Sequence, residues 1–176
     1  MLADGGFQVG ELAKLMYPDG VDVKTKDVAA AITETSELLK RDAVTIFEPA
    51  IVHEGFLVRV DVLIKRGNVF EVIEVKAKSY SGDASEMVGA RGGIKSNHLP
   101  YLQDVAFQKY VVQNAFPGST VTAHLLMPDK SKTALSPEVI SDTLGAILKY
   151  QDDIQKIQGS EAKRLLDETR KALTPA

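Results

Sequence analysis

The chain has 176 residues, which suits one domain with at most one appended element. Its net charge of −3 gives no global basic field, so a nucleic-acid partner would have to be held by a local patch or through metal ions. The absence of cysteine excludes disulfides, cysteine-bound zinc and thiol catalysis within the chain, and it fits a reducing cytoplasm. The sequence has no apolar run of about 18 residues and no signal-peptide pattern, so we expect no membrane partner.

The expected order of elements is helix, helix, three strands, helix, strand and helix. Helices are predicted over 7–17 and 27–40, the second with Asp27 as N-cap. The block 44–78 is rich in strand-forming residues and has polar breaks at 53–55 and 65–68, which predicts three antiparallel strands joined by short turns. A long loop rich in Gly, Ser and Asn follows over 79–100, of a kind that is often functional or disordered. A helix over 100–115, a strand over 120–127 and a helical tail complete the order.

This order predicts an α/β (α+β) fold with a central mixed sheet, whose antiparallel three-stranded core is flanked by helices. We expect a core domain over 1–135 and a C-terminal helical extension over 136–176. The helical pattern begins almost at the first residue, which leaves open that the chain is a fragment of a longer protein.

Asp61, Glu74 and Lys76 interrupt the apolar runs of the stretch VDVLIKRGNVFEVIEVK, residues 60–76. With a turn at 66–67, Asp61 would face Val72. Strand alternation would then gather Asp61, Glu74 and Lys76 on one face, with Arg59, and leave the opposite face nearly all apolar. Asp61 and Glu74 would be diagonal neighbours about 7–8 Å apart, which is close enough to share an ion.

The preceding strand adds a third carboxylate to this face. With a turn at 54–55, Glu48 lies directly across from Asp61, while Phe47 and Ile51 join the apolar side. Pro49 cannot donate to a ladder, so this strand is either an edge or bulged there. Three clustered carboxylates repel one another, and a divalent cation would relieve that repulsion.

A simpler interpretation is an ordinary charged sheet face. Arg59–Glu74 and Glu48–Lys76 would then be weak cross-strand ion pairs of little energetic value.

A hairpin with Asp on its first strand and Glu-x-Lys on its second resembles the PD-(D/E)XK nuclease superfamily; here it stands as Val60-Asp61 and Glu74-Val75-Lys76. A helix carrying a glutamine often follows in that superfamily, and YLQDVAFQKYVV supplies Gln108, with Gln103 as the less favoured choice. The combination is similar to the RecB-like branch, which includes CRISPR-associated exonucleases and uncharacterised bacterial relatives. The resemblance covers about residues 5–130 and implies a restriction-endonuclease-like fold.

The resemblance implies a metal-dependent deoxyribonuclease that uses Mg²⁺ or Mn²⁺. Asp61, Glu74 and the Val75 carbonyl would hold the ion, and Glu48 could hold a second one about 3.5–4 Å away. Lys76 would orient the water or stabilise the transition state, and whether it acts as a base or as a fixed charge stays open. Gln108 would hold the water or a phosphate oxygen.

The sequence departs from the RecB-like pattern at two places. Gly10 stands where the first helix commonly carries a metal-binding histidine, with Glu11 beside it as a possible substitute. The tyrosine usually found four residues after the helix glutamine is Val112, and Tyr110 is off register. These departures favour a second hypothesis, a non-catalytic nucleic-acid-binding or assembly module on the same fold. A third is an interaction domain that oligomerises through the C-terminal amphipathic helix.

Other candidates are weaker. Arg91 and Lys95 lie in the Gly-rich loop, where they could clamp a phosphate backbone or remain solvated. His98 ends that loop, and a plain loop residue is the favoured interpretation. The favoured interpretations are a solvated turn residue for His53 and a structural residue for His124. Asp104 shares a helix face with Gln108, and an acid in the first turn of a helix is its simpler interpretation.

Overall fold

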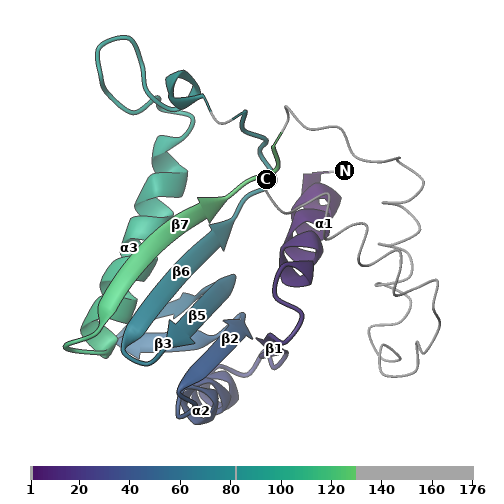
Figure 1. Ribbon diagram of the computed structural model, residues 1–176, viewed down its shortest axis with the longest axis vertical. Helices are drawn as coiled ribbons and strands as arrows, with labels where there is room; N and C mark the ends of the chain where they lie inside the picture. Colours follow the sequence, from purple (N-terminus) through teal and green to yellow (C-terminus); the bar gives the residue numbers. More distant parts are fainter. Residues whose placement is uncertain (1, 82, 130–176) are drawn as a thin grey trace, which may run out of the picture.

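The computed structural model describes residues 2–81 and 83–129 (Figure 1). The predicted extension over 136–176, its amphipathic helix and the end of the predicted core domain lie outside the described residues. Within those residues, no helix is both long and apolar enough to cross a bilayer.

The described chain has three α-helices, one 3-10 helix and seven strands. The helices are α1 (Leu2–Leu15), α2 (Val28–Leu38), η1 (Ala84–Glu86) and α3 (Leu99–Ala115), and the strands are β1 (Val21–Asp22), β2 (Ala43–Phe47), β3 (Ala50–His53), β4 (Phe56–Arg59), β5 (Val62–Arg66), β6 (Val69–Val75) and β7 (Thr120–Leu126). Asp27 is the N-cap of α2, as predicted, and its Oδ1 accepts a hydrogen bond from Ala30 N at 2.7 Å. The two-residue strand β1 was not predicted, because two residues carry no alternation to recognise.

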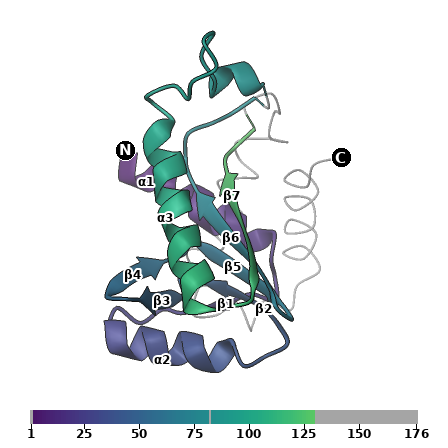
Figure 2. The ribbon, with the colours of Figure 1, turned by 90° about the vertical axis from the view of Figure 1, so that its left-hand side faces the viewer.

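The five-stranded sheet has the order β1-β2-β5-β6-β7. Strands β2, β5 and β6 pair antiparallel, whereas β1 and β7 run parallel to their neighbours at the two edges. The predicted α+β class, with a mixed sheet around an antiparallel three-stranded core, is therefore confirmed. Figure 1 shows α3 on one side of the sheet and α1 on the other, and Figure 2 shows α2 beneath the β3–β4 hairpin.

Both faces of the sheet are apolar. The larger cluster joins α3 to one face and consists of Ile51, Val58, Val60, Leu63, Phe70, Val72, Val105, Val111, Val112 and Val121. The smaller cluster, on the other face, consists of Phe47, Val62, Ile64 and Ile73, with Tyr17 packed against it. Tyr17, which follows α1, therefore covers part of one face of the sheet, and α3 covers the other.

Strands β2 to β5 form one long hairpin with a bend in it. The pairing of Phe47 with Val62 and that of Ala50 with Arg59 belong to a single register, which the hydrogen bond from Glu48 N to Asp61 O at 3.2 Å continues. The predicted pairing of Glu48 with Asp61 is confirmed. The bulge, one of the two alternatives expected at Pro49, is absent because no extra residue interrupts this register. The chain bends instead: Glu48 has a φ of 55° and the hairpin leaves the main sheet at this point.

The predicted register of the next hairpin is wrong by two residues. Val62 pairs with Ile73, so the position across from Asp61 is that of Glu74 and not Val72. The turn lies at 67–68, because Gly67 adopts the positive φ of 57° that a tight two-residue turn requires. A shift of two residues preserves the alternation of the side chains, so Glu74 and Lys76 still share one face, where they contact residues of α3.

The predicted apolar face is also corrected. Val58 and Val60 were expected beside Val62 and Ile64, yet they pack with Leu63 in the cluster beneath α3. The bend interrupts the alternation between positions 60 and 62, because the two ends of the long hairpin belong to different sheets.

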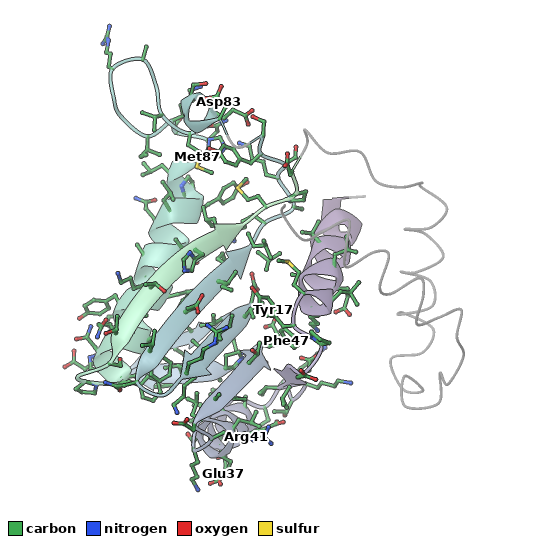
Figure 3. The ribbon with its side chains drawn as sticks, viewed as in Figure 1. Tyr17, Glu37, Arg41, Phe47, Asp83 and Met87 are labelled. Atoms are coloured by element: carbon green, nitrogen blue, oxygen red, sulfur yellow. The ribbon has the colours of Figure 1, made fainter. Side chains whose placement is uncertain are left out.

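Gly20 lies where the chain passes from α1 to β1, against the ring of Phe47. A Cβ atom at Gly20 would overlap the edge of that ring. Phe47 is buried beside Tyr17, and Figure 3 shows the two labelled rings next to each other. The absence of a side chain at Gly20 therefore allows this connection to close over the smaller cluster.

Gly20→Ala is expected to destabilise the protein by about 1–3 kcal/mol, because the new methyl group overpacks the Phe47 ring. Gly10→Ala is the matched control, since a Cβ at Gly10 would meet nothing within 4 Å and alanine favours the helix. Urea unfolding should show a lower midpoint for the first variant and an equal or higher midpoint for the second. Equal midpoints for Gly20→Ala and the wild type would contradict the packing argument.

Candidate active site

Several strand ends meet at one end of the sheet. Asp61 directly precedes β5, Glu74 and Val75 end β6, and Glu48 directly follows β2. Because β5 runs antiparallel to both β2 and β6, its beginning lies beside their carboxyl ends. The predicted site residues on these strands are therefore brought together by the sheet topology.

Glu74 is buried, with 5% of its surface exposed, and both of its oxygens are occupied. Its Oε1 lies 2.5 Å from Lys76 Nζ, and its Oε2 accepts a hydrogen bond from Gln108 Nε2 at 2.5 Å. Gln108 is likewise 5% exposed, and its Oε1 has no hydrogen-bond partner among the described residues. The sequence therefore predicted correctly that Glu74, Lys76 and Gln108 lie together.

Helix α3 supplies a second carboxylate to Lys76. Lys76 Nζ donates to Asp104 Oδ2 at 2.9 Å and lies 5.6 Å from the centre of the Tyr101 ring. The interpretation of Asp104 as a mere helix-terminal acid is therefore wrong, and the role of Tyr101 was missed. A signal was present, because Tyr101, Asp104 and Gln108 recur at the spacing of one helix face.

Asp61 joins β5 to the end of β6. Its Oδ2 accepts a hydrogen bond from Val75 N at 2.6 Å. This bond holds the carboxylate beside the main chain of Val75, whose carbonyl is the further metal ligand that the family resemblance implies.

A cavity of about 270 Å³ opens between this strand end and α1. Gly10, Glu11, Lys14, Glu48, Asp61, Val62 and Val75 line it. Glu11, named above as a substitute for the absent histidine, thus faces the same cavity as Asp61 and Glu48. Lys14 was not predicted from the sequence, and it contacts Glu11 at 3.0 Å and Asp22 at 2.7 Å.

The electrostatics of the site follow from burial and charge repulsion. Burial raises the pKa of Asp61, Glu74 and Glu48 above the ordinary carboxyl values. The charge of Glu48 raises the pKa of Asp61 further, and the charge of Asp61 does the same to Glu74. Burial alone would lower the pKa of Lys76, but its hydrogen bonds to Glu74 and Asp104 outweigh that effect and raise it.

The donor chemistry of this cluster fits Mg²⁺ or Mn²⁺, since three carboxylates and a backbone carbonyl are hard oxygen ligands. A divalent cation would also offset the repulsion that raises the carboxyl pKa values. The arrangement itself is closed, because Lys76 and Gln108 occupy both Glu74 oxygens. Across residues 2–81 and 83–129, no group of three His, Asp or Glu side chains is placed to hold an ion.

Two predicted ion pairs are wrong. Arg59 lies 4.0 Å from Glu48 and not beside Glu74, while Lys76 contacts Glu74 and Asp104 in place of Glu48. The bend in the long hairpin explains the first difference, because it separates the strand of Arg59 from the face that carries Glu74.

Other predicted residues lie apart from the cluster. Arg91 and Lys95 are exposed on the loop before α3, which extends beyond the end of that helix (Figure 1). His53 contacts Tyr110 edge-on, and His124 is exposed on β7. His98 is buried at the start of α3, and its Nδ1 has no hydrogen-bond partner in the described part of the chain.

The structure also places two further residues that the comparison with the family pattern named. Val112 belongs to the larger apolar cluster, so a tyrosine there would have to replace part of the core. Gln103, the less favoured glutamine, is exposed on α3.

Comparison with known proteins identifies no relative. No family model matches the chain, and no curated protein and no solved structure matches it significantly.

Asp61→Asn is expected to raise the unfolding temperature at neutral pH. Because burial raises the pKa of Asp61, ionisation of its carboxyl group weakens the fold as pH rises through the folded-state pKa. An uncharged amide removes this loss and still accepts the hydrogen bond from Val75 N. A gain of about 1 kcal/mol would raise the midpoint by about 2–4 °C.

The gain should shrink at lower pH, where the wild-type carboxyl group is already protonated. Asp83→Asn is the control of opposite sign, since hydrogen bonds from Ser85 lower the pKa of Asp83 and favour its charged form. Calorimetry from pH 4 to pH 8 measures both variants. Destabilisation of Asp61→Asn at neutral pH would contradict this view of the site.

Proposed function

We propose that the chain is a metal-dependent nuclease of the RecB-like PD-(D/E)XK type, which hydrolyses phosphodiester bonds of DNA in the cytoplasm. The observation that carries the proposal is the meeting of Asp61, Glu74, Lys76 and Gln108 at one end of a mixed sheet. A restriction-endonuclease-like fold is part of the proposal. It is supported by the antiparallel β2-β5-β6 core, by the parallel edge strand β7 and by α3 packed across one face.

In this proposal Asp61, Glu74 and the Val75 carbonyl hold the Mg²⁺ or Mn²⁺ ion, and Glu48 is the candidate ligand of a second ion. The ion, when bound, supplies Lewis-acid stabilisation of the phosphate and a more acidic water. Lys76 and Gln108 occupy both oxygens of Glu74, so Glu74 would have to release one of them to hold the ion.

Lys76 serves as a fixed positive charge and not as a base. Its ammonium group lies between Glu74 and Asp104, and two carboxylate partners favour the protonated form. An ammonium held at this place can stabilise the negative charge that develops on the phosphate in the transition state.

Gln108 positions the water. Its Nε2 is bound to Glu74, which fixes the amide, and its buried Oε1, which has no partner among the described residues, would accept a hydrogen bond from the water. Asp104 and Tyr101 are positioning residues, since they act on the ammonium group of Lys76 and not on the phosphate.

A second function is favoured by a specific observation. The closed state of Glu74, and the lack of a three-carboxylate group placed for an ion in residues 2–81 and 83–129, suit a non-catalytic nucleic-acid-binding or assembly module on the same fold. Such a module would bind nucleic acid without cleavage and without sensitivity to EDTA.

Cleavage of a linear DNA in Mg²⁺ or Mn²⁺ tests the proposal. Gln108→Ala should lower the rate by about 10²-fold or more, because the water and Glu74 lose the same positioning group. Gln103→Ala, on the same helix but exposed, should cleave at the wild-type rate. Asp61→Ala and Lys76→Ala should abolish activity while circular dichroism shows a retained fold.

Binding without cleavage in either metal would overturn the nuclease proposal and support the second function. Equal loss of activity in Gln103→Ala and Gln108→Ala would remove the role given to Gln108.

A further inference from the structure

A larger cavity of about 720 Å³ adjoins the candidate active site. Its walls are the linker between β1 and α2, the β3–β4 hairpin and the end of α1. Glu11, Lys14 and Glu48 line both this cavity and the smaller one that contains Asp61. The two cavities therefore adjoin each other, and together, from the carboxylates to the linker, they are called the groove below.

The linker is held in place by Arg59. The guanidinium group donates to Val23 O at 3.0 Å and to Thr25 O at 3.4 Å. Val23 is buried, and its N–H donates to Phe47 O at 3.0 Å. Lys24 lies between the anchored residues Val23 and Thr25, and Lys26 directly follows them. Both lysines are therefore attached to a fixed stretch of backbone.

The charge of the groove changes along its length. At the inner end, Lys14 is neutralised by Glu11 and Asp22. At the outer end, Lys24 and Lys26 are exposed, and neither has an ion-pair partner among the described residues.

Apolar side chains flank these outer lysines. Val28 is 48% exposed and Leu57 is 39% exposed, and both line the groove. A basic rim with apolar walls suits a strand that carries regularly spaced phosphates and apolar sugar surfaces.

We propose that this groove binds the phosphodiester backbone of a nucleic-acid strand, with Lys24 and Lys26 contacting phosphates that flank the bond at the carboxylate end. The inference rests on the proposed function, because it takes that end as the place of cleavage. It assigns the backbone contacts to the β1–α2 linker, whereas the sequence pointed to Arg91 and Lys95 on the exposed loop.

Fluorescence anisotropy in EDTA tests the groove without any need for catalysis. The probe is a labelled single-stranded oligonucleotide of 20 nucleotides, as DNA in one arm and as RNA in the other. Lys24→Ala/Lys26→Ala is compared with Lys40→Ala/Lys109→Ala, which removes the same charge from exposed positions outside the groove. Arg91→Ala/Lys95→Ala is measured beside them.

The groove variant should bind at least about 10-fold more weakly at low salt, and the slope of log K against log salt should fall by about 1.4, as expected for two lost contacts to a single strand. The control pair should keep the wild-type slope. Equal losses in both pairs, or a loss confined to Arg91→Ala/Lys95→Ala, would overturn the inference.

The binding and cleavage experiments test the groove proposal and the nuclease proposal separately. Binding that depends on Lys24 and Lys26, without cleavage in Mg²⁺, would support the groove proposal and refute the nuclease proposal. Cleavage that is unaffected in Lys24→Ala/Lys26→Ala, with unchanged binding, would refute the groove and leave the nuclease standing.

Discussion

The contact between Lys76 and the buried Glu74 is the interaction on which the site depends. A carboxylate at 5% exposure is costly to ionise unless charged and hydrogen-bonding partners compensate, and Lys76 and Gln108 occupy both of its oxygens. Through Lys76 the same interaction reaches Asp104, so the strand end and α3 are joined by one network. Removing Lys76 or Gln108 would leave one oxygen of the buried Glu74 without its partner, so these two contacts help to hold α3 on the sheet.

The backbone geometry explains why charged residues such as Asp61 and Glu48 occur beside the strands. The long hairpin bends at 48–49, opposite 60–61, so Asp61 stands at the point where β5 begins and accepts the hydrogen bond of Val75 N. The bend also turns the β3–β4 end toward the linker after β1, where Arg59 holds the outer wall of the groove. A single irregularity therefore forms both the carboxylate end and the linker end of one groove.

Much of this could be predicted from the sequence. Strand alternation has a period of two, so a register error of two residues still placed Asp61, Glu74 and Lys76 together. Gln108 was placed with them by the resemblance to the nuclease superfamily, in which a helix carrying a glutamine often follows the hairpin. The packing of Val58 and Val60 could not be predicted, because a bend between two sheets resets the alternation. The pairing of Asp104 with Lys76 depends on the rotation of α3 about its axis, which contacts with the sheet determine.

The claim that this end of the sheet takes a divalent cation is tested most directly by titrating Mn²⁺ into the protein in a calorimeter, with Asp61→Asn as the comparison. The account predicts measurable, saturable heat for the wild type and its loss in the variant, whose fold is intact. Absence of heat in the wild type, or the same heat in both proteins, would contradict a cation site built on Asp61 and Glu74.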